Sequence, residues 1–335
     1  MQIVFLNTFE KPSEGNGVIS AQLSICEEQG LWSVNWLEES ELGQGEDSAN
    51  SWFEGTSWEE MITAFRHGVA KVMGQGYTPI IESLLENGRS SGGSLVTMLQ
   101  CYGELNSDPE LFELLREWRR KTASAEKKSA YLVTTNRMLW MISAFVPQTE
   151  GELKLLPGWG QTKHDTYGSS ILEITSQKER DTVFPLDWVS DKLDTEVYTA
   201  WLYKQKENKY KDLMDKQQEK KRILTLLQQS STLDQIQSEL SIPRRELLLR
   251  IEQLEQEGYN IEPLIEQELI TVPESEQQLI WDALTKVGDR YLKPVLLQVY
   301  GENVDNSRER PVELLYEKLR LMRMRYRRNG QGKAV

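Results

Sequence analysis

Apolar and polar residues alternate along much of the first forty positions of the chain. Such alternation predicts strands, because successive side chains of a strand point to opposite faces. The predicted strands cover residues 2–9, 18–26 and 30–38. A short Glu-Glu-Gln-Gly turn joins the second strand to the third and makes them a hairpin. Ser57 and Glu60 then have the spacing of a capping box, which predicts that a helix starts at this point.

From residue 107 onward the apolar positions recur at helical spacing almost everywhere. Asp108 before Pro109 and Thr149 before Glu152 predict helix starts, and a long charged helix is predicted over residues 190–229. The fold class is therefore expected to be mainly α and multi-domain, with a small α+β domain at the N-terminus. The predicted domains are an acidic β-α domain at 1–106, a helical domain at 107–176, a linker and long helix at 177–218, and a helical domain containing a helix-turn-helix at 219–335.

The net charge of −13 arises entirely in the first third of the chain. Residues 1–110 carry four Lys and Arg against seventeen Asp and Glu, whereas residues 111–335 carry 35 of each. Because like charges repel, the acidic first third is expected to keep phosphate away. The remaining two thirds can bind phosphate through local basic patches.

Catalytic motifs are missing from the sequence. There is no GxxxxGK[ST] phosphate loop, and the two histidines, His67 and His164, form no HExxH motif. Cys26 and Cys101 form no CxxC pair. We therefore expect a protein without enzymatic activity, metal or cofactor. No apolar run approaches the ~20 residues of a membrane helix and the N-terminus has no secretory pattern, so we expect a cytoplasmic protein, associated with the nucleoid if bacterial.

Three sequence patterns between residues 111 and 174 occur together: LFxxLRxWR at the start, LxxLPGxG in the middle and KxxxYG near the end. In this combination the segment resembles the HRDC domain, a small helical module found at the C-terminal end of RecQ-family helicases and of RNase D. The resemblance implies a bundle of four or five helices and an association with nucleic acid. The chain as a whole resembles the accessory half of such a helicase without its motor.

A Gly-x-Gly turn at the start of a helix suits phosphate, because the backbone can approach closely and the helix presents free N–H groups. Lys163 lies in the first turn of the predicted helix, and helical spacing places further cations on neighbouring positions. The residues of this domain predicted to bind nucleic acid are Arg116, Arg119, Arg120, Lys127, Lys128, Gly158, Gly160 and Lys163.

Two further basic stretches lie in the C-terminal domain. Residues 231–263 predict two helices joined by the turn Ser241–Pro243, and the apolar positions of 221–258 are expected to form one small core of three helices. Arg244 and Arg245 then stand at the position from which a recognition helix contacts DNA. From residue 318 onward the chain has seven cations and no acid. The arginines predicted to contact phosphate there are Arg320, Arg323, Arg325, Arg327 and Arg328. The segments from 260 to 328 resemble the helix-turn-helix region at the C-terminus of some Firmicute-type RecQ helicases.

Residues 18–77 resemble a WGR domain in the strand AQLSI, the LGQG loop and a helix ending in AKVMGQGY. Trp36-Leu37-Glu38 stands where that family has Trp-Gly-Arg, so the arginine is lost. We therefore expect Trp36 to be a core residue and the acidic surface to face a protein.

Together these features predict a non-catalytic accessory or adaptor protein of DNA repair or recombination. Its expected partners are single-stranded or branched DNA, bound weakly and in a salt-dependent manner, and a helicase or another DNA-processing protein. A membrane or a small-molecule substrate is not expected. Two alternatives remain open: a protein-interaction module that binds no DNA, and a helix-turn-helix transcription regulator.

Overall fold

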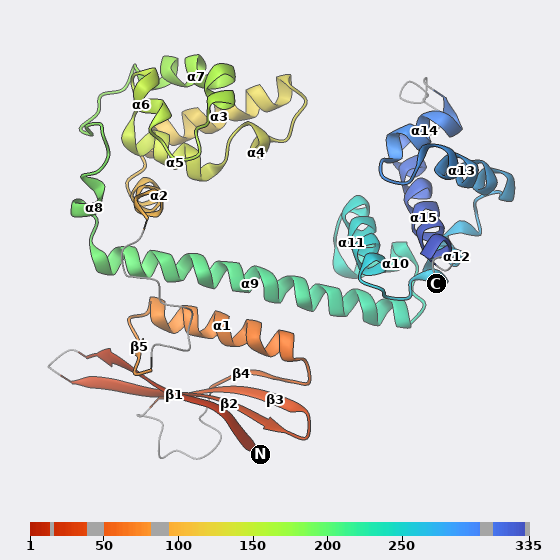
Figure 1. Ribbon diagram of the computed structural model, residues 1–335, viewed down its shortest axis with the longest axis horizontal. Coiled ribbons are helices and arrows are strands. Elements are labelled where there is room, and N and C mark those ends of the chain that lie inside the picture. The colour runs from red at the N-terminus through yellow and green to blue at the C-terminus, as the bar shows by residue number, and fades with distance from the viewer. Residues whose placement is uncertain (14–16, 39–49, 82–93, 302–310, 332–335) are drawn as a thin grey trace. The chain divides into compact units, whose positions relative to one another are not determined.

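The computed structural model describes the chain except for residues 14–16, 39–49, 82–93, 302–310 and 332–335 (Figure 1). The LGQG loop and Lys333 lie outside the described residues. The chain forms two compact units, Met1–Met214 and Asp215–Val335. Helices predominate in both, as the sequence predicted, and the described strands all lie near the N-terminus.

The first unit begins with an antiparallel sheet of five strands, in the order β4-β3-β2-β1-β5, covered by one helix (Figure 1). Its elements are β1 (Gln2–Pro12), β2 (Val18–Glu28), β3 (Leu31–Glu38), β4 (Asn50–Gly55), α1 (Trp58–Gly74) and β5 (Thr78–Pro79). The predicted Trp36 is buried in the core between sheet and helix, together with Phe9, Leu23 and Met61.

Local signals in the sequence explain most of this domain. Gln29 and Gly30 form the tight turn between β2 and β3 with φ angles of 52° and 84°, a conformation that glycine adopts without strain. The Ser57 side chain accepts a hydrogen bond from the Glu60 N–H and caps α1, as predicted. Strand β4 was not predicted from the sequence, because its adjacent aromatic residues Trp52 and Phe53 break the alternation of apolar and polar positions.

A helical bundle follows in the first unit. Its helices are α2 (Leu95–Leu105), α3 (Pro109–Ala125), α4 (Ala130–Val133), α5 (Asn136–Phe145), α6 (Glu150–Lys154), α7 (Gln161–Thr175) and α8 (Val189–Lys192). Leu111, Leu139 and Ile171 are fully buried at its centre. Tyr102 from α2 and Val189 from α8 join the same core. The core of this bundle therefore includes residues on both sides of segment 107–176.

The long charged helix predicted at 190–229 is α9 (Thr195–Gln228), which runs from the first unit into the second. Near its start it packs against α2: Tyr198 and Trp201 are buried with Cys101, and the Trp201 indole N–H donates to the Glu104 carboxylate over 2.9 Å. Burial of the Cys101 thiol raises its pKa to about 11, so this cysteine is a packing residue.

Helices are the only regular elements among the described residues of the second unit. It contains α10 (Leu233–Leu240), α11 (Arg244–Gln256), α12 (Glu262–Leu269), α13 (Glu274–Val287), α14 (Leu292–Tyr300) and α15 (Val312–Gln331). The apolar positions predicted to pack within 221–258 are buried or half-buried, and they form one core with the helices that follow. Leu315, Leu319, Met322 and Met324 place α15 against that core.

Candidate nucleic-acid interface

The predicted Gly-x-Gly turn joins α6 to α7. Gly158 has a φ of 87°, and a Cβ atom there would lie 3.4 Å from the Met138 methyl group of α5. Trp159 is buried, whereas Gly160 is the N-cap of α7 and provides no side-chain cap. The first N–H groups of α7 therefore lack a capping side chain, and Lys163 stands in the same turn.

Three contacts bring other segments to this end of the bundle. The Tyr167 hydroxyl of α7 donates to the Glu126 carboxylate at the end of α3 over 2.8 Å. The Arg119 guanidinium of α3 donates to the Thr134 carbonyl, just before α5, over 3.1 Å. The turn at Gly158 packs on Met138. Residues 126–128, 134–138 and 158–163 are thus fixed together, and we call them the convergent end.

The nine Lys and Arg side chains of residues 108–175 differ in their partners. Four of them are paired with a carboxylate: Arg116 with Glu113 at 3.0 Å, Lys121 with Glu117 at 3.7 Å, Lys128 with Glu126 at 3.0 Å and Lys154 with Glu150 at 3.9 Å. Arg119 is buried, and burial lowers the pKa of its guanidinium. It serves as an internal hydrogen-bond donor. Within the described part of the chain, the side chains of Arg120, Lys127, Arg137 and Lys163 make no ion pair or hydrogen bond.

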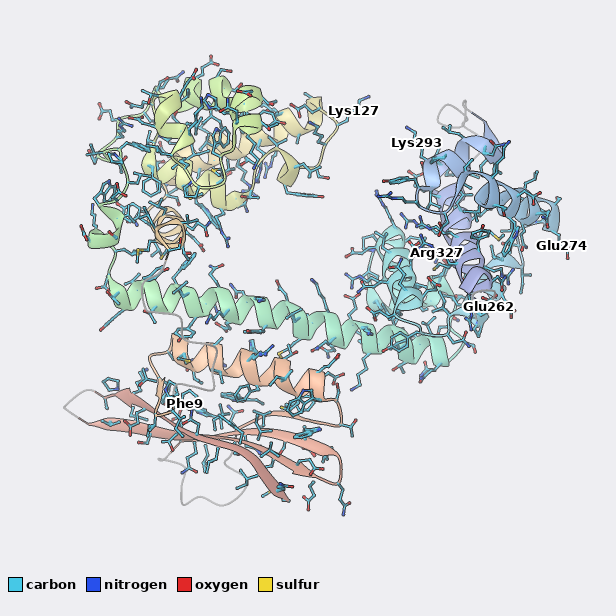
Figure 2. All side chains as sticks on the ribbon, viewed as in Figure 1. Phe9, Lys127, Glu262, Glu274, Lys293 and Arg327 are labelled. Atoms are coloured by element: carbon cyan, nitrogen blue, oxygen red, sulfur yellow. The ribbon has the colours of Figure 1, made fainter. Side chains whose placement is uncertain are left out.

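Position separates these four unpaired cations further. Arg120 lines a shallow groove with Glu110, Glu113 and Glu117, whose negative charge opposes phosphate binding. The other three, Lys127, Arg137 and Lys163, belong to the convergent end, and Figure 2 shows Lys127 projecting from the turn after α3.

Arg137 was missed in the sequence analysis. Its signal is local: Thr135 caps α5 by accepting a hydrogen bond from the Met138 N–H, so Arg137 lies in the first turn of that helix. Only the fold shows that this turn lies beside the Gly158 turn.

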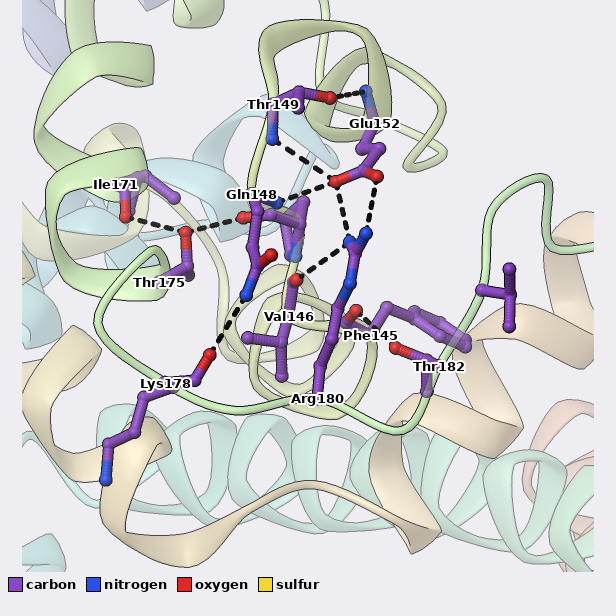
Figure 3. Close-up of polar contacts among 12 residues, drawn as sticks. Phe145, Val146, Gln148, Thr149, Glu152, Ile171, Thr175, Lys178, Arg180 and Thr182 are labelled. Carbon is purple, nitrogen blue, oxygen red and sulfur yellow. Dashed lines mark hydrogen bonds and ion pairs between the residues drawn. The ribbon is translucent and has the colours of Figure 1, made fainter.

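A polar network ties the C-terminal ends of α5 and α7 to α6 and to residues 178–182 (Figure 3). Thr149 and Glu152 form the predicted capping box of α6, and the Arg180 guanidinium donates to both oxygens of Glu152 over 2.7 and 2.8 Å. The Thr175 and Thr182 hydroxyls donate to the carbonyls of Pro147 and Phe145, each over 2.6 Å. Hydrogen bonds, foremost from Arg180, lower the pKa of Glu152 to about 2. Glu152 is therefore a permanent anion at neutral pH and ties residues 178–182 to the bundle.

The two arginines at the start of α11 differ from each other. Arg244 is half-buried and donates to Glu317 over 2.6 Å and to Asp234 over 2.8 Å. Arg245 is exposed and makes no ion pair among the described residues. Of this predicted pair only Arg245 has an unengaged charge.

The arginines of α15 make ion pairs within the second unit. Arg320, Arg323 and Arg327 all contact the Glu252 carboxylate of α11, at 3.0, 2.6 and 3.2 Å. Arg325 contacts Glu262 of α12 at 3.0 Å, and Arg328 donates to Asn260. Their contact with phosphate stays a prediction, and it would have to compete with these partners. We infer that their first role is to hold α15 on its neighbours.

The described residues hold no group of three or more His, Cys, Asp and Glu side chains placed to bind a metal. None of the helices described is long and apolar enough to cross a bilayer.

Comparison with known proteins places the helical bundle in a family. The family model of the HRDC domain matches residues 108–175. The ATP-dependent DNA helicases UvrD2 of Mycobacterium bovis and Mycobacterium tuberculosis are 36% identical to this chain over 67 residues, which is 20% of this chain and 10% of each helicase. No solved structure matches the chain. The chain is thus an HRDC-domain protein, and residues 108–175, with the Gly-x-Gly turn at their centre, are its HRDC domain.

Proposed function

We propose that this protein is a non-catalytic accessory protein of DNA metabolism that binds DNA through the convergent end of its HRDC domain. The matched relatives are DNA helicases, which supports a role related to DNA. The match covers only the accessory domain, a tenth of each helicase, so their ATP-dependent activity is not carried over.

The observation that carries this proposal is the position of the unpaired cations. Lys127, Arg137 and Lys163 come from three segments that the fold fixes together, and none has a carboxylate partner among the described residues. An unpaired cation can neutralise a phosphate without first losing an ion pair. The uncapped N–H groups of α7 lie in the same place and favour an anion.

A pair of triple variants tests the proposal. The first, Lys127→Gln with Arg137→Gln and Lys163→Gln, removes the unpaired cations. The matched control, Lys121→Gln with Lys154→Gln and Lys178→Gln, removes three paired cations of the same bundle, whose partners are carboxylates at 3.3 to 3.9 Å. Binding of fluorescein-labelled forked, single-stranded and duplex DNA to the full chain is measured by anisotropy between 50 and 200 mM salt.

We expect the wild type to bind with an affinity that falls as salt rises, because phosphate contacts release counterions. On single strands each phosphate contact adds ~0.7 to the slope of log affinity against log salt. Loss of three contacts in the first variant should therefore lower this slope by about 2. The control should leave the slope nearly unchanged. Equal losses in both variants would mean that net charge alone determines binding. A wild type that binds none of the three DNAs at 50 mM salt would overturn the proposal.

A further inference from the structure

The turn between α13 and α14 and the two adjoining helix ends, residues 286–293, carry a basic surface that the sequence patterns did not indicate; we call this segment the connector. Lys286, Arg290 and Lys293 are exposed there, and none of their side chains makes an ion pair or hydrogen bond with any described residue. Figure 2 shows Lys293 at the start of α14. The connector therefore presents three free cations within eight residues.

Two arginines of α15 fix the backbone of this connector. The Arg323 and Arg327 guanidinium groups both donate to the Asp289 carbonyl, over 3.4 and 3.3 Å. The Arg327 Nε also donates to the Asp289 carboxylate, which lowers the pKa of that carboxyl. Asp289 is therefore neutralised by an internal partner and does not cancel the charge of the exposed cations.

The described cations of the connector outnumber the carboxylates beside them. Glu252 and Asp289 pair with Arg320, Arg323 and Arg327, and Glu255 interacts with Arg327 and Arg328. The exposed carboxylate of Asp282 lies four residues before Lys286 on α13 and accepts a hydrogen bond from Gln278. Against this one carboxylate stand Lys286, Arg290 and Lys293, and such a local excess of positive charge attracts polyanions.

An exposed aromatic ring lies in the middle of these cations. Tyr291 is 62% exposed, and the Arg290 guanidinium lies over its ring at 5.2 Å from the centroid. A large exposed ring beside cations is the combination on which unpaired bases stack while their phosphates are neutralised. A duplex hides its base faces, and an acidic peptide uses the cations but not the ring.

We propose that the α13–α14 connector is a second nucleic-acid contact that binds single strands, with Tyr291 stacking on a base and Lys286, Arg290 and Lys293 holding the flanking phosphates. The inference rests on the proposed function of the chain as a DNA-binding protein but uses none of the HRDC residues. In this arrangement Arg323 and Arg327 are positioning residues, since they hold the connector backbone.

The test measures binding of fluorescein-labelled oligo-dT to the full chain at several salt concentrations. One variant combines Lys286→Gln, Arg290→Gln and Lys293→Gln. Its matched control combines Lys209→Gln, Lys211→Gln and Lys216→Gln, which removes the same charge from exposed positions of α9. A separate variant, Tyr291→Ala, removes only the ring, and its exposure makes a folding defect unexpected.

In the connector variant the slope of log affinity against log salt should be smaller by about 2. Raising the salt from 50 to 200 mM should therefore weaken binding by the wild type about twentyfold more than binding by the variant. Tyr291→Ala should weaken oligo-dT binding at least about fivefold and leave duplex binding unchanged, because only a single strand offers a free base face. Ultraviolet cross-linking should attach oligo-dT to the peptide that contains Tyr291.

Several results would overturn the inference. Wild-type affinity in the connector variant, with loss only in the HRDC variant, would refute the connector and leave the proposed function intact. An equal loss of affinity in the α9 control would mean that net charge, and not the position of the connector cations, determines binding. Displacement of oligo-dT by polyglutamate at equal charge concentration would mark a general anion surface. Absence of any binding by the wild type would refute both proposals together.

Discussion

The ion pair between Glu152 and Arg180 should stabilise the HRDC domain by an amount that depends on pH. Arg180 lies outside the matched residues 108–175, yet it contacts both oxygens of Glu152 and the Val146 carbonyl. The two side chains are 16% and 22% exposed. Replacement by Arg180→Gln removes the charge and leaves a carboxylate with its backbone donors alone.

The magnitude follows from the pKa of Glu152, which is lowered from 4.5 to about 2. A shift of this size corresponds to roughly 3 kcal/mol at neutral pH, since each pKa unit is about 1.4 kcal/mol. Backbone N–H groups of Gln148 and Thr149 also contribute to it. We therefore assign about 2 kcal/mol to Arg180.

The sign of the pH dependence is fixed by the direction of the shift. A carboxyl whose pKa is lowered on folding contributes stability above its unfolded pKa, and this contribution is lost as pH falls through the folded value. The difference between wild type and Arg180→Gln should thus be full above pH 5 and fall by about half on the way to pH 3.

Hydrogen exchange of the α6 and α7 amides, measured by mass spectrometry in the full chain, provides the assay. The ratio of the exchange rate in the variant to that in the wild type, taken at each pH, removes the pH dependence of the intrinsic exchange rate. A difference of about 2 kcal/mol corresponds to about a thirtyfold ratio. Lys178→Gln is the control, because its partner Glu110 is 85% exposed and such a pair contributes little. A ratio near one at pH 7, or one that stays constant down to pH 3, would refute this reasoning.

Three other substitutions test the packing of the chain. Glu252→Gln should destabilise the second unit by about 3 kcal/mol, because three arginines lose the charge of a carboxylate that is 5% exposed. The free energy of unfolding is measured by urea titration, with hydrogen exchange of the α15 amides as the signal. Gly68→Ala should unfold the N-terminal sheet domain, since its Cβ would lie 2.0 Å from the Trp52 ring. We expect a changed near-ultraviolet circular dichroism spectrum. An unchanged spectrum would contradict this packing of Trp52 on Gly68. Gly158→Ala should lower the melting temperature of the HRDC domain, because alanine at a φ of 87° is strained by about 1 kcal/mol. Gly151→Ala is the control and should leave the melting temperature unchanged, because its Cβ would meet no atom within 4 Å.

Much of the candidate site could be found from local patterns. The motifs between residues 111 and 174 identify the HRDC domain, and the same motifs contain Lys163 and the glycine turn. Arg137 and the connector cations were not found, because no motif distinguishes them from the many other charged positions of a helical surface. Whether such a cation is free depends on its neighbours in space.

The sequence by itself determined most of the helices and strands of this protein and the HRDC identity of residues 108–175. Helix starts at Ser57, Asp108 and Thr149 were predictable because a capping side chain acts on N–H groups only three residues away. Only the tertiary structure decided what the charges do. Three α15 arginines, Arg320, Arg323 and Arg327, bind Glu252, which lies 68 to 75 residues earlier in the chain. Lys127, Arg137 and Lys163, in contrast, have no carboxylate partner among the described residues. The physical reason is that an ion pair depends on distance in space, which composition and spacing along the chain do not specify.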